Sequence, residues 1–220
     1  MRDRPLPVLL CLLTAITGIV DAVSFLALGH VFVANMTGNV VFVAFAAAGA
    51  PDLSIGGSLL ALAAFMLGAF VAGRWGAKTQ AARMVRLGVV AKGSLTAAAL
   101  AVIAIAGTDG AVRYASIALL AVAMGLQGAV VLRVAGGEPS TNILTSTLTA
   151  LAASAPIGGA HGPVAHRVLA ALALLAGAGF GAVLVLRAGP AAALAFALVL
   201  LGASAFAIHG LYGHNVNPGE

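Results

Sequence analysis

Residues 18–39 of the chain, GIVDAVSFLALGHVFVANMTGN, decide how the rest of the sequence is interpreted. They contain the end of one apolar run, residues 6–28, and the first half of a second, residues 31–48. A bilayer span needs roughly 20 apolar residues, so the first run is long enough to cross. The second run is shorter and has the polar sequence NMTGN, residues 35–39, near its centre. This stretch therefore predicts a membrane helix followed by a short, broken segment.

The composition of the whole chain agrees with this interpretation. Of its 220 residues, 62% are hydrophobic and 8% are charged, whereas soluble domains have about 25% charged and 45–50% apolar residues. A soluble globule is therefore excluded, and nucleic-acid binding has no support. We expect one transmembrane domain, residues 1–220, embedded in a lipid bilayer.

The order of segments is repeated along the chain. The first half has a long run, a short polar-centred run and two more long runs, at residues 54–75 and 87–106. The second half contains four runs in the same order, at residues 112–134, 140–155, 164–186 and 190–211. This order predicts an internal two-fold repeat with halves at about 6–106 and 112–211.

The basic residues decide between two topologies. Four of them lie at the end of the third run and in the loop before the fourth: Arg74, Lys78, Arg83 and Arg86. If both short segments enter and leave on the same side, these residues are cytoplasmic with the N-terminus, as the positive-inside rule requires. We therefore predict an all-α polytopic membrane protein with six crossing helices and two short broken or re-entrant segments. Three crossings per half make the repeat inverted. Eight crossings are the alternative, because an 18-residue helix of roughly 27 Å could just span.

Asp21 is the most informative single residue, because it lies about seven residues inside the first run. An ionised carboxylate at this depth costs several kcal/mol unless it is paired or hydrated. One interpretation is a proton or cation site that faces a polar cavity. The other is a carboxylate that bonds to neighbouring backbone or to Thr17 and locks two helices together.

The polar centres of the two short segments are the other candidate sites. Gly and Asn tolerate non-helical angles, and Thr or Asn can cap a restarted helix. The helix N-terminus would then face a cavity and suit a small anion or polar solute. With Asp21, the predicted substrate or ion pathway consists of Asn35, Thr37, Gly38, Asn39, Gln127, Asn142 and Thr145.

Two further polar residues have competing interpretations. Gln127 either faces Asp21 across a pseudo-two-fold axis or bonds to a neighbouring helix. Lys92 lies five or six residues into the fourth run. It is too far in depth from Asp21 to pair with it, so we expect its ammonium group to reach the membrane interface.

The sequence offers little support for catalysis or cofactors. The five histidines are scattered without the spacing of a metal site on one helix face. The chain has no nucleophile elbow, P-loop or paired carboxylate. We expect no enzyme activity, no metal and no cofactor.

The residues that carry these features resemble a known family. The pattern Gly18-x-x-Asp21-Ala22 followed by residues 35–39, and the later Gly125-Leu126-Gln127 with residues 145–149, are similar to the signatures of the YoaK family of bacterial integral membrane proteins. The resemblance covers nearly the whole chain. The function of that family is unknown, so the resemblance implies a fold and a membrane location without a substrate.

The sequence thus favours a small-solute transporter or permease of the bacterial inner membrane, with a cytoplasmic N-terminus and Asp21 as the group that couples transport to protons or cations. A passive channel and a non-transporting scaffold or partner subunit are the alternatives. The expected partners are the lipid bilayer and an unknown small polar solute or ion. The sequence is also compatible with a homo-oligomer.

Overall fold

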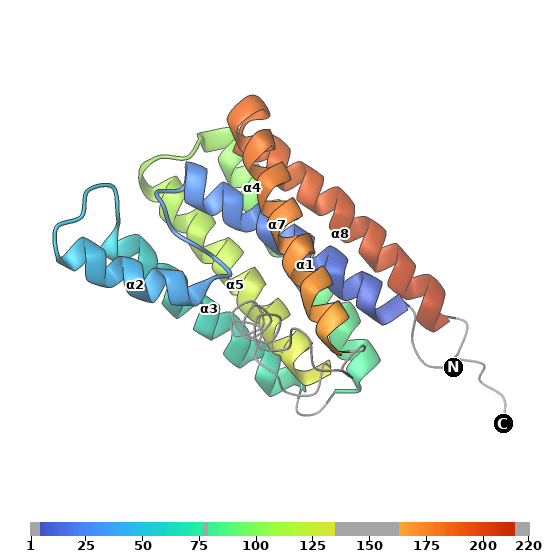
Figure 1. The fold of residues 1–220 in the computed structure, drawn as a ribbon. Helices are drawn as coiled ribbons and strands as arrows, with labels where there is room; N and C mark the ends of the chain where they lie inside the picture. Colours follow the sequence, from blue (N-terminus) through green and yellow to red (C-terminus); the bar gives the residue numbers. More distant parts are fainter. Residues whose placement is uncertain (1–4, 77–78, 135–162, 214–220) are drawn as a thin grey trace, which may run out of the picture.

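The computed structural model describes residues 5–76, 79–134 and 163–213, and in these ranges the chain forms seven helices and no strand (Figure 1). The helices are α1 (Pro5–Ala27), α2 (Met36–Ala47), α3 (Ile55–Gly76), α4 (Ala81–Ala106), α5 (Gly110–Val134), α7 (Pro163–Ala188) and α8 (Pro190–Gly213). The predicted all-helical, polytopic fold is confirmed. The second short segment, residues 140–155, lies outside the described ranges.

Helix length separates α2 from the others. Six helices have 22 to 26 residues, and α3, α4, α5 and α7 are long and apolar enough over their described side chains to cross a membrane. In contrast, α2 has 12 residues and is about 18 Å long, well short of the roughly 30 Å hydrocarbon core. This length opposes the eight-crossing alternative at the first short segment.

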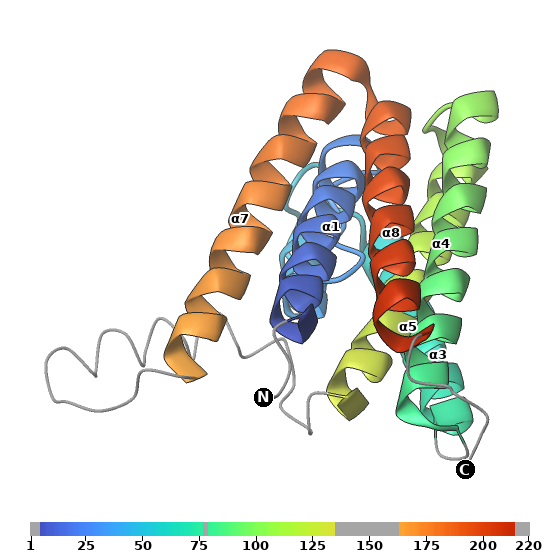
Figure 2. The same ribbon diagram turned by 90° about the vertical axis from the view of Figure 1, so that its right-hand side faces the viewer.

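Successive long helices run in opposite directions (Figure 2). α1 packs most extensively on α7, and α3 on α5, while α4 packs on α5 and α8. Short connections make this arrangement possible. Gly107 ends α4 with a φ of 78°, and Gly189, with a φ of 89°, separates α7 from Pro190 at the start of α8. Glycine after a helix and proline at a first helical position are the usual signals for these ends.

The two ends of the bundle carry different charges. One end, here called the aspartate end, holds Asp52 and Asp109 in the connections after α2 and α4, together with Arg113 in the first turn of α5 and Arg187 in the last turn of α7. The other, the basic end, holds the exposed residues Arg74, Arg83, Arg86 and Arg133. The sequence predicted a basic loop between the third and fourth runs, but Arg74 lies inside α3 and the two following arginines lie inside α4. Long arginine side chains can follow a helix out of the apolar layer, so both helices continue through them.

Small residues allow α1 and α7 to approach closely. A Cβ atom at Gly18 would lie 2.5 Å from the Leu174 carbonyl oxygen and 2.6 Å from the Ala178 nitrogen. A Cβ atom at Gly177 would collide with the Ala15 carbonyl oxygen. These are backbone atoms, which cannot move aside as side chains do. In a membrane, where lipid is as apolar as the protein, such contact between backbones is a main source of helix association.

The contact between α3 and α5 is built in the same way. A Cβ atom at Gly125 would collide with the Phe65 carbonyl oxygen and lie 3.0 Å from the Ala69 nitrogen. A Cβ atom at Gly68 would collide with the Val122 carbonyl oxygen. Each interface therefore has a glycine on both helices that faces the backbone of the partner helix, and Gly181 of α7 adds a second on that helix, where a Cβ atom would lie 2.7 Å from the Ile19 Cα atom.

Candidate functional site

The chain between α1 and α3 enters the bundle and returns to the end from which it came (Figure 1). Gly29 and His30, with φ of 89° and 56°, end α1 and turn the chain back. The Nδ1 atom of His30 lies 3.2 Å from the carbonyl oxygen of Asp52, which is 22 residues later. Both ends of the segment are thus held together at the aspartate end. This segment, residues 28–54 and here called the hairpin, has the re-entrant course predicted for it.

Asp21 supports the non-helical part of the hairpin. It is 9% exposed and lies six residues, or about 9 Å, before the end of α1. Its Oδ1 atom accepts hydrogen bonds from the backbone N–H groups of Val33 at 3.0 Å and Ala34 at 2.9 Å. Within a bilayer, backbone groups outside regular helices need partners inside the protein. The Asp21 carboxylate is the hydrogen-bond acceptor for two consecutive N–H groups.

Asn39 provides hydrogen-bond partners for Phe32, the residue before Val33 and Ala34. Its Oδ1 atom accepts a hydrogen bond from the Phe32 N–H group at 3.0 Å, and its Nδ2 atom donates one to the Phe32 carbonyl oxygen at 2.6 Å. The Asn39 side chain is fully buried. One amide therefore satisfies both backbone polar groups of Phe32, as a neighbouring strand would do in a sheet.

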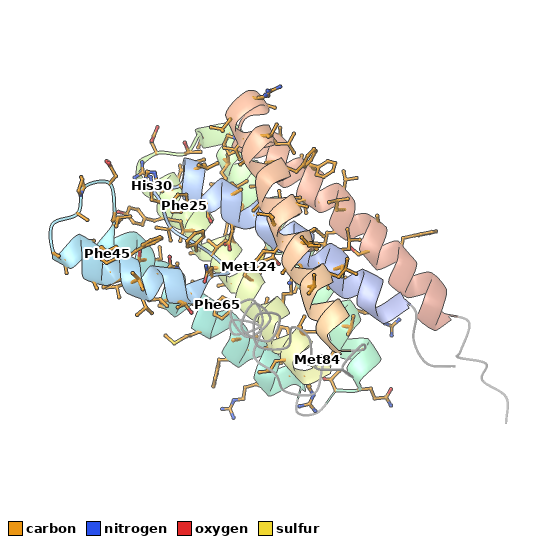
Figure 3. All side chains as sticks on the ribbon, in the orientation of Figure 1. Phe25, His30, Phe45, Phe65, Met84 and Met124 are labelled. Atoms are coloured by element: carbon orange, nitrogen blue, oxygen red, sulfur yellow. The ribbon has the colours of Figure 1, made fainter. Side chains whose placement is uncertain are left out.

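Gly38 and an aromatic cluster complete the packing of the hairpin. A Cβ atom at Gly38 would lie 2.7 Å from Cδ2 of Phe32, so only glycine leaves room for this ring. Phe32 stacks on Phe25 of α1 and on Phe42 of α2, with ring centroids 5.0 Å and 5.6 Å apart. Figure 3 shows Phe25 beside His30 at the turn after α1, and their centroids are 5.1 Å apart.

Asn35 and Thr37 differ from these residues because both are exposed on the protein. Asn35 occupies the N-cap position of α2, yet its side chain makes no capping hydrogen bond. The prediction that Asn or Thr would cap the restarted helix is therefore wrong for the Asn35 side chain. Asp21 and Asn39 already hold the preceding backbone, so α2 can begin without a side-chain cap.

A second polar cluster lies deeper in the bundle and joins three helices. Lys92 of α4 donates a hydrogen bond to Oε1 of Gln127 on α5. The Gln127 Nε2 atom donates to Oγ1 of Thr17 on α1 at 3.1 Å, and Thr17 donates to the Leu13 carbonyl oxygen at 2.9 Å. Gln127 thus bonds across helices, which was one of its two predicted roles.

Lys92 corrects an expectation from the sequence. Its side chain is 1% exposed, so its ammonium group does not reach the interface. The reason is that α4 begins at Ala81 and not near residue 87. Lys92 is then eleven residues, or about 16 Å, from the start of the helix, beyond the reach of its side chain. Lys92 was not predicted to belong to the pathway, although a lysine inside a membrane helix is a functional candidate by default.

The two clusters are neighbours along α1. Thr17 and Asp21 are four residues apart, which places them on the same face of that helix about 6 Å apart along its axis. The structure thus places Asp21 and Asn39 against the hairpin backbone and Gln127 one turn of α1 away, through Thr17, while the side chains of Asn35 and Thr37 are exposed. Asn142 and Thr145 lie outside the described residues. In the described ranges no group of three His, Cys, Asp or Glu side chains lies close enough to hold a metal.

A bundle of long antiparallel helices with a re-entrant hairpin at membrane depth defines a polytopic helical membrane protein. The chain belongs to the family described as "Protein of unknown function (DUF1275)", which matches residues 9–207. It is also similar to the UPF0700 transmembrane protein YoaK of Bacillus subtilis (strain 168), with 45% identity over 64 residues. That match covers 29% of this chain and 28% of YoaK, so less than a third of each. No solved structure matches the chain. The family resemblance predicted from the sequence is confirmed.

Proposed function

We propose that this protein is a small-solute transporter of the bacterial inner membrane and that its solute passes the first turn of α2. The observation that carries the proposal is the hairpin itself. Backbone without regular hydrogen bonds occurs at membrane depth only where protein buries it or where it lines a wet cavity. In many transporters, helices interrupted in this way mark the binding site. The exposed side chains of Asn35 and Thr37 give this turn a polar surface.

We infer that the two halves form an inverted repeat, which would support the same proposal. The residues of the α3–α5 contact correspond to those of the α1–α7 contact at nearly constant spacing. Val122 and Gly125 come 107 residues after Ala15 and Gly18, while Leu174, Gly177 and Ala178 come 109 residues after Phe65, Gly68 and Ala69. α1 and α5 run in opposite directions (Figure 2). Inverted halves of this kind are common in secondary transporters, where they rock against each other around the site.

Asp21 is the proposed coupling group. Its ionised carboxylate accepts hydrogen bonds from Val33 and Ala34, and hydrogen bonds to a charged acceptor are stronger than those to a neutral one. Protonation would weaken both bonds and loosen the hairpin. A proton bound at Asp21 would therefore change the position of the α2 N-terminus, where the solute is proposed to bind.

The charge distribution supports an orientation. Among the described residues, four arginines lie at the basic end, Arg74, Arg83, Arg86 and Arg133, while the aspartate end has two, Arg113 and Arg187, together with Asp52 and Asp109. The positive-inside rule places the basic end in the cytoplasm. Because α1 begins at the basic end (Figure 2), the N-terminus would be cytoplasmic and the hairpin would open toward the outside.

A non-transporting scaffold is the second candidate. It is favoured by the hydrogen bonds of Asp21 and Asn39, because both side chains bind backbone groups of the hairpin and so stabilise the fold. The two candidates differ at Asn35 and Thr37, whose exposed side chains a scaffold of this kind would not need.

The test is uptake into proteoliposomes. A panel of small labelled solutes would first be screened with the wild-type protein for saturable uptake. The variant Thr37→Val removes the exposed hydroxyl at the first turn of α2, and Thr79→Val removes a hydroxyl from the short connection between α3 and α4. We expect Thr37→Val to reduce uptake and Thr79→Val to leave it unchanged. Equal uptake in both variants, or no saturable uptake of any solute by folded wild type, would contradict the proposal.

A further inference from the structure

Lys92 lies at the centre of the bundle in an environment with little solvent. It is 1% exposed, about 16 Å from the start of α4 and about 21 Å from its end. Its ammonium group contacts the Gln127 side chain. A charged group at this depth is costly unless another group compensates for it.

No carboxylate compensates for this charge among the described residues. The one ion pair in the ranges 5–76, 79–134 and 163–213 joins Arg113 and Asp109, at 3.4 Å near the aspartate end. Asp52 lies in the connection after α2. Asp21 forms its hydrogen bonds with the hairpin backbone. The described part of the bundle thus contains a lysine without a counter-charge.

Hydrogen-bond donors around Lys92 are also in excess. An ammonium group has three N–H donors, and Gln127 is its hydrogen-bond acceptor. Thr96 lies one turn further along α4, and its buried hydroxyl has no hydrogen-bond partner. Threonines in membrane helices usually bond to the carbonyl group four residues earlier, which here belongs to Lys92. The Thr96 hydroxyl is therefore a second available donor on the same face of α4, about 6 Å further along the helix axis than Lys92.

We propose that Lys92 and Thr96 form a binding site for a small monovalent anion inside the bundle. The anion supplies the missing negative charge and accepts hydrogen bonds from both side chains. Gln127 and Thr17 are positioning residues, because the chain of hydrogen bonds from Leu13 through Thr17 fixes the Gln127 amide with its oxygen toward Lys92. Anion binding at this site does not require transport, so the binding test is independent of the function proposed above.

Chloride is a suitable probe because its binding is measured directly by the line width of ³⁵Cl NMR. The full-length protein in detergent would be titrated with sodium chloride, with sodium gluconate holding the ionic strength constant. We expect saturable excess line broadening with the wild type. Lys92→Met should remove it, corresponding to a loss of affinity of more than about tenfold. Arg86→Met, which removes an exposed cation from the same helix, should leave it unchanged.

A second variant keeps the test decisive if Lys92→Met does not fold. Thr96→Val is nearly isosteric, and the hydroxyl that it removes has no partner to lose. We expect it to weaken chloride binding by about three- to tenfold, the value of one hydrogen bond, with Thr79→Val as the matched control. Absence of saturable broadening in wild type, or equal broadening in wild type and Thr96→Val, would overturn the proposal.

Discussion

The side-chain amide of Asn39 forms hydrogen bonds with both backbone polar groups of Phe32, at 3.0 Å and 2.6 Å. The two residues are seven positions apart, one in α2 and the other in the non-helical part of the hairpin. Their contact holds the hairpin against its own helix. Together with the bonds from Val33 and Ala34 to Asp21, it explains how three successive non-helical residues are accommodated at membrane depth.

Asn39→Leu should therefore destabilise the protein strongly. The change leaves the Phe32 N–H and carbonyl groups without partners, at a cost of about 2–4 kcal/mol. Asn35→Leu is the matched control, because this exposed amide makes no capping bond and should change stability by less than about 0.5 kcal/mol. Thermal unfolding of the purified protein in detergent measures both. Similar unfolding midpoints for the two variants would contradict the structural role of Asn39.

Asp21→Leu should release the hairpin while the long helices stay folded. The substitution removes the acceptor for the N–H groups of Val33 and Ala34, whereas Asp21→Asn keeps one neutral acceptor oxygen. The measurement is the rate of maleimide labelling of Ala34→Cys, in a background in which the single cysteine, Cys11, is replaced by serine. We expect labelling to be fastest with Asp21→Leu, intermediate with Asp21→Asn and slowest with Asp21 intact. Equal rates would show that Asp21 does not hold the hairpin.

The course of the hairpin could be predicted from the sequence because its signals are local. These signals are an apolar run with one acid, a Gly-His break and a short polar-centred run. Their lengths and backbone preferences restrict the path that the chain can take. The direction of insertion, expected from the distribution of arginines, stays a prediction. The two proposed roles of Asp21 could not be separated in this way, because its partners Val33 and Ala34 are 12 and 13 residues away.

The cluster around Lys92 could not be predicted, because it depends on contacts between helices. Lys92 and Gln127 are 35 residues apart, and Gln127 and Thr17 are 110 apart. Hydropathy also placed the start of α4 too late, since Arg83 and Arg86 interrupt the apolar run without ending the helix. The error in the helix start led directly to the error in the depth of Lys92.

Gly18→Ala and Gly125→Ala should each destabilise the bundle, and by similar amounts. A Cβ atom at either position meets carbonyl oxygens and amide nitrogens of the partner helix, so the helices must separate at a cost of about 1–3 kcal/mol or more. Gly73→Ala is the control, because no atom lies within 4 Å of its added Cβ. Thermal unfolding in detergent is again the measurement. A large effect at one glycine and none at the other would contradict an equivalent role in two repeated halves.

The proposed orientation predicts which sites a membrane-impermeant thiol reagent reaches in intact cells. Asp52→Cys and Asp109→Cys, each in the Cys11→Ser background, should react from outside. Arg74→Cys and Arg86→Cys should react only after the membrane is made permeable, because the basic end is cytoplasmic in this proposal. The reverse labelling pattern would contradict the proposed orientation of the protein in the membrane. His30→Cys and Asp52→Cys, at the two ends of the hairpin, should react from the same side, and labelling of these two from opposite sides would contradict the re-entrant course.

Gln127→Glu tests the charge balance at Lys92 without removing the lysine. The new carboxylate would lie in direct contact with the ammonium group, because Oε1 of Gln127 already accepts its hydrogen bond. A fixed negative charge at that position repels an anion, and two unit charges 4 Å apart interact by about 4 kcal/mol at an effective dielectric constant of 20. Chloride-dependent ³⁵Cl broadening should therefore disappear, although Lys92 and Thr96 are unchanged. Gln80→Glu adds the same charge at an exposed position before α4 and should leave the broadening as it is in wild type. If Gln127→Glu binds chloride as well as Gln80→Glu does, the anion is held somewhere other than beside Lys92.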